Sequence, residues 1–199
     1  MTPHLKKLID KLQFLPGVGP KTAMRMAMNM LKDKDLTNQL GHTIVEAVAA
    51  INHCEQCRNF SEGPKCSICS DNTRDHNIIC VIETPSDLMS VEESMCFTGR
   101  YYVLMGRISP IDGIGPEDIG IPELIKQCAT QQITEVILAT NSTVEGEVTA
   151  QYITNQLKPL KIPCSRIGYG MPIGGELEYL DGNTVKQALL SRKNWVNTH

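Results

Sequence analysis

The chain has 199 residues, of which 41% are hydrophobic and 21% are charged, and its formal net charge is -3. This composition is typical of a globular protein of one or two domains. It excludes a transmembrane class, because no apolar run approaches the roughly 20 residues that span a bilayer. The first twelve residues, MTPHLKKLIDKL, hold no continuous apolar segment. We therefore expect no secretory signal and a cytoplasmic protein.

The small net charge hides an uneven distribution. Residues 1–32 contain six basic side chains and one acidic one, a balance of +5, whereas the other 13 basic and 21 acidic side chains leave the remainder at -8. A basic N-terminal segment on an otherwise acidic chain favours contact between residues 1–32 and a polyanion. A solvated helix face would carry the same charges, so charge alone leaves both interpretations open.

Three helices are predicted in the first 50 residues. Apolar residues recur at helical spacing over residues 3–14, LPGVGP then interrupts the pattern, and a second helix of strong helix formers begins at Pro20. A third helix is expected at about residues 36–50, with an apolar face made of Leu40, Ile44, Val45 and Val48.

The interruption between the first two helices has the pattern of a helix-hairpin-helix DNA-binding motif. Gly17 and Gly19 let the chain turn sharply without Cβ clashes. The free backbone N–H groups of such a turn, at the positive end of the second helix, suit a phosphate. Lys21 and Arg25 are four residues apart, so they share a helical face and can neutralise neighbouring phosphates. This grip predicts sequence-independent DNA binding, and a plain helical turn is the alternative.

Four cysteines follow in two pairs, and each pair encloses two residues: Cys54, Cys57, Cys66 and Cys69. In a reducing compartment such cysteines indicate metal binding or burial instead of disulfides. Two Cys-x-x-Cys turns can supply a closed tetrahedral set of thiolates for one zinc ion. Because no coordination position stays open, the spacing predicts a structural site and not a catalytic one.

After the cysteines the pattern changes to alternating strands and helices. Strands are predicted at residues 78–82, 101–105, 135–139 and 164–170, with helices after Thr84 and at about 122–131 and 146–158. This alternation predicts a parallel sheet covered by helices on both faces. A long loop separates the second strand from the next helix. The chain is expected to end with a short strand, ELEYL, and a helix near residues 183–193.

Acidic residues gather where two of these strands end. Glu83 follows the first strand, and ILATNSTVEGEVTA runs from the third strand into a helix that carries Glu145 and Glu147. If the two strands are neighbours, these carboxylates meet at the carboxyl edge of the sheet, where open α/β folds bind ligands. The carboxylates could hold one magnesium ion loosely.

Taken in order, LPGVGPKTAMR, the four-cysteine knuckle, IICVIET, SPIDGIGPEDIGI, ILATNSTVEGEVTA and GYGMPIGGELEYLD closely resemble the RecR family of bacterial recombination-repair proteins over essentially the whole chain. The resemblance implies a Toprim domain with Glu83 at its conserved glutamate. It also implies a ring-shaped homotetramer around DNA, and work with RecO and sometimes RecF to load RecA on single-stranded DNA at gaps.

The expected fold is thus mixed α and α/β, in four parts. These parts are a helix-hairpin-helix domain (1–53), a four-cysteine zinc finger (54–76), a Toprim domain (77–172) and a C-terminal oligomerisation segment (173–199). Toprim enzymes carry Asp-x-Asp after the third strand, where this chain has Asn141 and Thr143. We therefore expect a DNA-binding mediator with one structural zinc, a doubtful magnesium site and no enzymatic activity. A metal-dependent nuclease or topoisomerase-like enzyme is the alternative.

Overall fold

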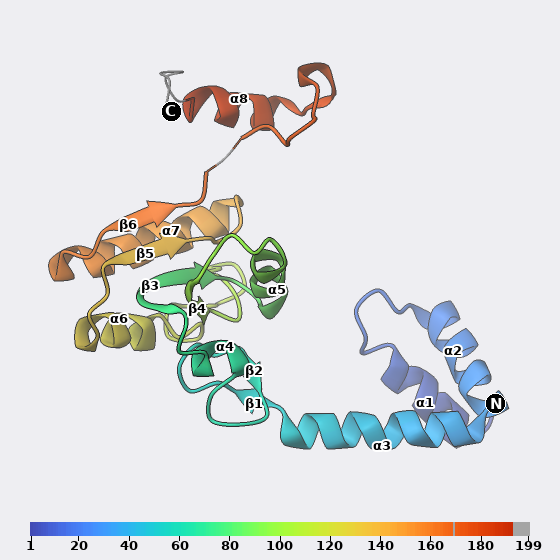
Figure 1. Ribbon diagram of the computed structural model, residues 1–199. Helices are drawn as coiled ribbons and strands as arrows, with labels where there is room; N and C mark the ends of the chain where they lie inside the picture. Colours follow the sequence, from blue (N-terminus) through green and yellow to red (C-terminus); the bar gives the residue numbers. More distant parts are fainter. Residues whose placement is uncertain (169, 193–199) are drawn as a thin grey trace. The chain divides into compact units, whose positions relative to one another are not determined.

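The computed structural model describes residues 1–168 and 170–192, and the chain divides into two compact units, Met1–Asn52 and His53–His199. The first unit consists of three helices, α1 (Pro3–Leu12), α2 (Pro20–Lys32) and α3 (Lys34–Ala50) (Figure 1). Helices α1 and α2 pack through Ile9 of one helix and Ala23 and Ala27 of the other. The small alanine side chains let the two helices approach closely.

Helix α3 forms where the sequence predicts it, but its apolar face is exposed in the part of the chain that the structure describes. None of its residues is buried, and Val45 and Val48 are 70% and 77% exposed. Helical spacing predicts which residues share a face, whereas the element that covers the face is not encoded in the spacing.

The second unit begins with the cysteine knuckle. A two-stranded sheet pairs β1 (Asn52–His53) with β2 (Phe60–Ser61), and one helical turn, α4 (Ser67–Ser70), follows. The segment is too short for a hydrophobic core of its own, and its buried cluster consists of the four cysteines.

A four-stranded parallel sheet forms the centre of the second unit, in the order β4-β3-β5-β6. Its strands are β3 (Asp75–Ile82), β4 (Gly99–Val103), β5 (Glu135–Leu138) and β6 (Cys164–Arg166). In the register, Cys80 of β3 lies opposite Tyr101 of β4 on one side and Ile137 of β5 on the other. The strands end together, so the residues after β3 and β5 share one edge of the sheet.

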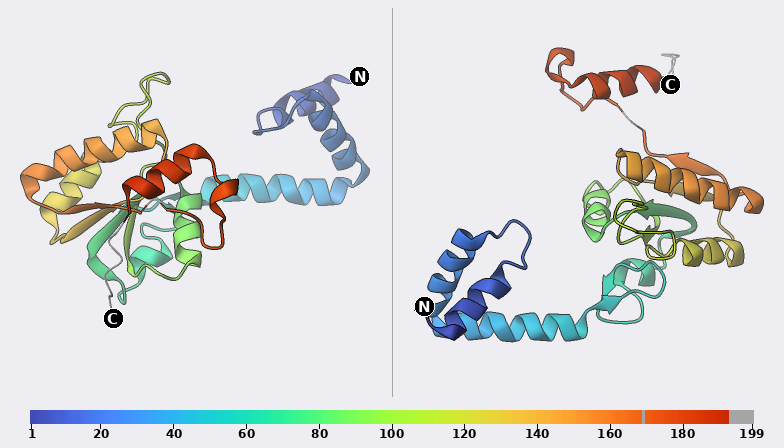
Figure 2. Two further views of the ribbon diagram at one scale, coloured as in Figure 1. Left: turned by 90° about the horizontal axis from the view of Figure 1, so that it is seen from above. Right: turned by 180° about the vertical axis from the view of Figure 1, so that it is seen from behind.

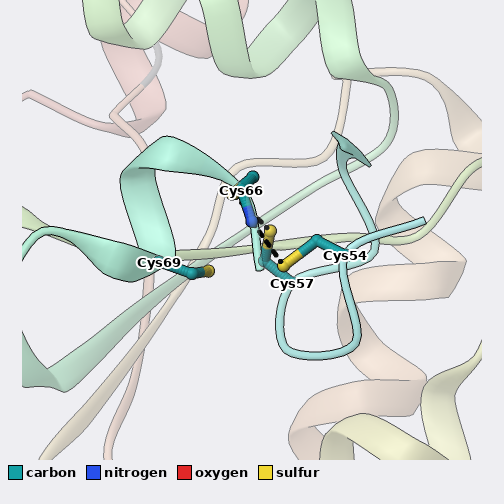
Figure 3. Close-up of side chains that lie close together, drawn as sticks. All are labelled: Cys54, Cys57, Cys66 and Cys69. Atoms are coloured by element: carbon teal, nitrogen blue, oxygen red, sulfur yellow. Dashed lines mark hydrogen bonds between the residues drawn. The ribbon is translucent and has the colours of Figure 1, made fainter. Parts of the chain in front are cut away.

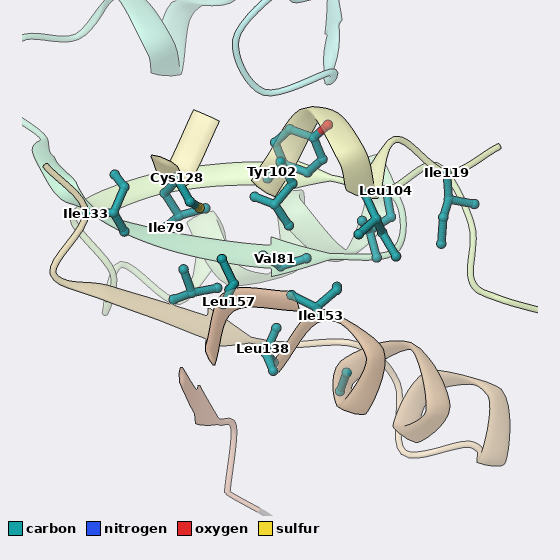
Figure 4. Close-up of a cluster of buried hydrophobic side chains, with 14 of the residues drawn as sticks. Ile79, Val81, Tyr102, Leu104, Ile119, Cys128, Ile133, Leu138, Ile153 and Leu157 are labelled. Atoms are coloured by element: carbon teal, nitrogen blue, oxygen red, sulfur yellow. The ribbon is translucent and has the colours of Figure 1, made fainter. Parts of the chain in front are cut away.

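Helices cover both faces of this sheet. Helices α6 (Ile121–Thr130) and α7 (Val144–Leu157) pack on one face, and α5 (Pro85–Glu93) packs on the other (Figure 2). The larger core lies under α6 and α7, where Val81, Leu138 and Ile153 meet (Figure 4). The prediction of a parallel sheet with helices on both faces is confirmed.

The predicted long loop connects β4 to α6 and is fixed by internal contacts. Ser109 and Ile114 exchange two backbone hydrogen bonds, with N···O distances of 3.0 and 2.9 Å. The backbone N–H of Ile108 donates to Thr149 Oγ1 of α7 at 2.9 Å, and Ile108 and Ile119 are buried.

The predicted strand at ELEYL is wrong. Residues Leu177–Tyr179 form a 3-10 turn, η2, in which the Tyr179 N–H donates to the Glu176 carbonyl at 3.1 Å. A strand needs a partner to satisfy its backbone groups, and a segment without one closes its hydrogen bonds locally. Helix α8 (Gly182–Leu190) follows as expected. Residues 193–199 of the predicted C-terminal segment, and Tyr169, lie outside the described residues.

Another 3-10 turn, η1 (Lys158–Leu160), ends α7. In the part of the chain that the structure describes, no helix combines the length and apolar character needed to cross a bilayer.

Candidate functional site

The turn between α1 and α2 has the backbone geometry that the hairpin motif requires. Gly17 has φ +76°, in the left-handed region that favours glycine. Gly19 is the N-cap of α2 and offers no side-chain cap, while Pro20 occupies the first turn. By contrast, α1 and α3 are capped by the side chains of Thr2 and Asp33. The start of α2 thus leaves its backbone N–H groups for an external acceptor.

Lys21 and Arg25 lie on the outer face of α2. Both are exposed, whereas Ala23 and Ala27, two positions further along in each case, are fully buried against α1. Two residues turn a helix by about 200°, so the cationic pair points away from the core. One apolar stripe therefore fixes the helix, and the opposite stripe presents two cations beside its uncapped start.

The four cysteines converge in the knuckle (Figure 3). Their sulfur atoms all lie within 4.8 Å of one another, and all four residues are buried. A tetrahedral zinc–thiolate centre with Zn–S of about 2.3 Å needs sulfur atoms roughly 3.8 Å apart. The donor set of Cys54, Cys57, Cys66 and Cys69 fits one zinc ion.

Backbone hydrogen bonds favour the thiolate form of one of the four cysteines. Burial acts to raise the pKa of the Cys54 thiol, but backbone hydrogen bonds from Cys57, Cys66 and Gln56 lower it to about 7. Burial raises the pKa of the Cys66 thiol to about 11. Four buried thiolates need a cation to offset their mutual repulsion, which a divalent metal supplies.

The knuckle is fastened to the edge strand of the large sheet. The carbonyl of Cys57 accepts a hydrogen bond from Val103 N of β4 at 2.8 Å. The next residue, Arg58, has φ +63°, and its guanidinium donates a hydrogen bond to the Ile119 carbonyl. The central carbon of this guanidinium lies 6.0 Å from the ring centroid of Tyr102. Cys57 thus contacts β4, and Arg58 contacts the end of the 106–121 loop.

At the carboxyl edge of the sheet, Glu83 is buried and doubly hydrogen-bonded. Its two carboxylate oxygens accept bonds from the backbone N and the side-chain Nδ2 of Asn141, each at 2.8 Å. Arg107 lies 4.0 Å from the same carboxylate. A Cβ on Gly146 would stand 2.1 Å from the Asn141 carbonyl oxygen and 2.9 Å from Glu83 Oε1. The Glu83–Asn141 contact therefore needs glycine at this point of α7.

Glu145 and Glu147 lie in the first turn of α7, whose N-cap Thr143 accepts a hydrogen bond from Gly146 N at 3.1 Å. Glu147 Oε1 accepts from Arg166 Nη2 of β6 at 2.7 Å. Within residues 1–168 and 170–192, the four cysteines are the one group of three or more Cys, His, Asp or Glu side chains whose ligand atoms lie close enough to hold a metal ion. The three glutamates share an edge of the sheet without forming such a group.

Sequence reasoning missed Arg107 and Arg166. Arg166 is the last residue of β6, so the parallel order of the sheet places it at the same edge as Glu83. The predicted strand continues to residue 170, so the strand ends expected from the sequence do not single out Arg166. Arg107 stands one residue inside the long loop and carries no such signal either.

Comparison with known families matches consecutive parts of the chain. Residues 5–48 match the model for "RecR, helix-hairpin-helix", and residues 51–71 match the RecR zinc-finger domain with four cysteine ligands. Residues 77–168 match "Toprim domain" and residues 170–193 match "RecR, C-terminal".

Curated relatives match over nearly their full length. The chain is 47% identical over 194 residues to the "Recombination protein RecR" of Hahella chejuensis, covering 97% of this chain and 96% of the relative. It is 45% identical over 193 residues to the protein of that name from Coxiella burnetii, covering 96% of each chain. It is 47% identical over 193 residues to the one from Saccharophagus degradans, covering 96% of this chain and 98% of the relative. With such identity over the whole length and three RecR-specific domain matches, the chain belongs to the RecR family of recombination proteins.

Proposed function

We propose that this protein is a non-catalytic DNA-binding mediator of recombinational repair. It works with RecO, and in some settings RecF, to load RecA on single-stranded DNA at gaps. The observation that carries the proposal is the exposed pair Lys21 and Arg25 beside the uncapped start of α2. The relatives named as recombination proteins support the same role. A protein that acts on bacterial chromosomal DNA works in the cytoplasm.

The hairpin grips the DNA backbone and not the bases. The free N–H groups at the start of α2 receive one phosphate, and the two cations neutralise its neighbours. Phosphates are identical in every sequence, so binding is sequence-independent and weakens as salt rises.

The test is a salt titration of DNA binding by the double variant Lys21→Ala/Arg25→Ala. Each lost phosphate contact should flatten the slope of log K against log salt by roughly 0.7–0.9, similarly for all sequences. Lys32→Ala is the control for the loss of one cation, because Lys32 is exposed on the same helix, about 16 Å from Lys21 and about 10 Å from Arg25. Unchanged affinity of the folded double variant would refute the proposed interface.

The acidic edge of the sheet supports the non-catalytic part of the proposal. Two-metal phosphoryl chemistry needs several carboxylates converging on ions about 3.5–4 Å apart. Here Asn141 and Thr143 are neutral, and both oxygens of Glu83 are engaged by Asn141. These residues do not fit a catalytic metal pair. DNA cut by the purified protein with Mg²⁺ or Mn²⁺, and left intact by Glu83→Ala, would favour the nuclease alternative.

We propose that Glu145 and Glu147 form an acidic rim that binds a basic surface of RecO. Charge reversal of both residues to lysine should abolish association with RecO and leave DNA binding intact, as measured by pull-down and DNA titration. The control Glu55→Lys/Glu62→Lys makes the same change of charge at two exposed residues of the knuckle. Loss of RecO binding in both variants would show a bulk charge effect and contradict a specific rim.

The same proposal extends to assembly. The four parts predicted from the sequence, 1–53, 54–76, 77–172 and 173–199, act as a DNA-binding domain, a zinc finger, a Toprim domain and an oligomerisation segment of a ring tetramer. Exposed apolar side chains on α3 and near the C-terminus supply surfaces that association would bury.

A further inference from the structure

One guanidinium ties together three elements at the acidic edge of the sheet. Arg166 Nη1 donates to the Leu138 carbonyl at the end of β5 at 2.8 Å, and Nη2 donates to the Asn141 carbonyl at 3.2 Å. The same Nη2 donates to Glu147 Oε1 of α7 at 2.7 Å, and Nε reaches that oxygen at 3.3 Å. The Arg166 side chain is 21% exposed and that of Glu147 is 52% exposed, so the ion pair lies at the surface, while two backbone carbonyls fix the guanidinium.

The acceptors of Arg166 belong to the ligand class that hard divalent cations prefer. Magnesium and manganese bind carboxylate and carbonyl oxygens, and here one carboxylate and two carbonyl oxygens surround a single positive group. The planar guanidinium suits several oxygens in fixed directions. Because it cannot lose its proton in a protein, its charge is permanent.

The buried carboxylate at this edge already has partners. Glu83 is held by two donors of Asn141 and has Arg107 at 4.0 Å. A divalent ion would have to displace these donors and approach a fixed positive charge, which repels it.

We propose that Arg166 is a resident counter-ion that takes the place of a divalent metal at this Toprim site, excludes Mg²⁺ and Mn²⁺, and holds Glu147 in position on the acidic rim. The inference deepens the proposed non-catalytic role and names the residue responsible. It does not depend on RecO, whose binding tests the rim separately.

The experiment is a titration of the zinc-loaded, full-length protein with Mn²⁺, followed by electron paramagnetic resonance of the free ion. The unmodified protein should show no Mn²⁺ binding that depends on Glu147. Arg166→Met should gain a Mn²⁺ site at least tenfold tighter than any Mn²⁺ binding by the unmodified protein. Arg166→Met/Glu147→Gln should lose this site and return to the level of the unmodified protein. Lys158→Met, which removes one cation at the far end of α7, should leave binding unchanged.

Two further variants keep the test decisive. Arg166→Lys retains the positive charge and should still exclude Mn²⁺. Arg166→Gln carries the same expectation as Arg166→Met if the latter does not fold by circular dichroism. Equal binding by the unmodified protein and the folded neutral variant would overturn the proposal, as would a gain that persists without Glu147. Tight Mn²⁺ binding by the unmodified protein without DNA cleavage would overturn the counter-ion and leave the non-catalytic role standing.

Discussion

Gly146 stands where the buried carboxylate of Glu83 meets the end of β5, and this is the tightest point of the acidic site. A methyl group there would press on the Asn141 carbonyl at 2.1 Å, which is backbone that Arg166 also holds. We expect Gly146→Ala to destabilise the protein by about 1–3 kcal/mol, the usual cost of overpacking. The loss is measured as a lower midpoint of denaturant unfolding.

The matched control is Gly41→Ala on α3. No atom lies within 4 Å of the point where a Cβ on Gly41 would stand, so alanine adds helix propensity without a clash. The gain should be up to about 1 kcal/mol. Equal stability of the two variants would mean that the crowding at Gly146 is relieved without cost.

At the scale of elements, we expect the stability of β4 to depend on the folding of the zinc knuckle, because the two are hydrogen-bonded through Val103 and Cys57. Cys66→Ser should release zinc, because three thiolates cannot close the tetrahedron, and zinc binding worth about 10–16 kcal/mol holds such segments together. We expect faster hydrogen exchange at Val103, whose N–H donates to Cys57, while β5 stays protected.

Cys96→Ser is the control for this change. Cys96 is an exposed cysteine outside the knuckle, so its replacement should keep one zinc per chain by elemental analysis and leave exchange at β4 unchanged. A zinc-free Cys66→Ser protein with native protection at Val103 would contradict the coupling.

The elements themselves could largely be predicted from local pattern. Thr84 before a proline and an acidic third residue indicates a helix start, and Thr84 does cap α5 with a complete capping box. The spacing of the four cysteines predicts their convergence, because the chemistry of one zinc ion needs it. The alternation of strands and helices predicts the parallel sheet.

Other features could not be predicted because they depend on partners distant in sequence. ELEYL alternates like a strand, but among the described residues no strand pairs with it, and it closes into η2. Arg166 reaches Leu138 and Asn141 only because β6 lies beside β5. The residue pattern within one segment does not show which other segment lies beside it, so neither feature could be predicted.

At the scale of the whole molecule, the C-terminal segment exposes large apolar side chains. Leu177, Tyr179, Leu189 and Leu190 are each at least 60% exposed in the single chain. We expect deletion of residues 176–199 to lower the oligomer mass seen by light scattering, because an assembly that buries these side chains loses that contact. Tyr179→Ser/Leu190→Ser should shift the mass in the same direction. An unchanged oligomer would assign assembly to other surfaces, such as α3.

Because Val103 of β4 donates a hydrogen bond to Cys57, we expect the edge of the large sheet to respond to the redox state of the four cysteines. Oxidants that attack zinc thiolates would release the metal and loosen the knuckle, which removes the cover from the outer edge of β4. An uncovered edge strand pairs readily with other chains. We therefore expect oxidation of the four cysteines to favour aggregation of the protein through the edge of β4.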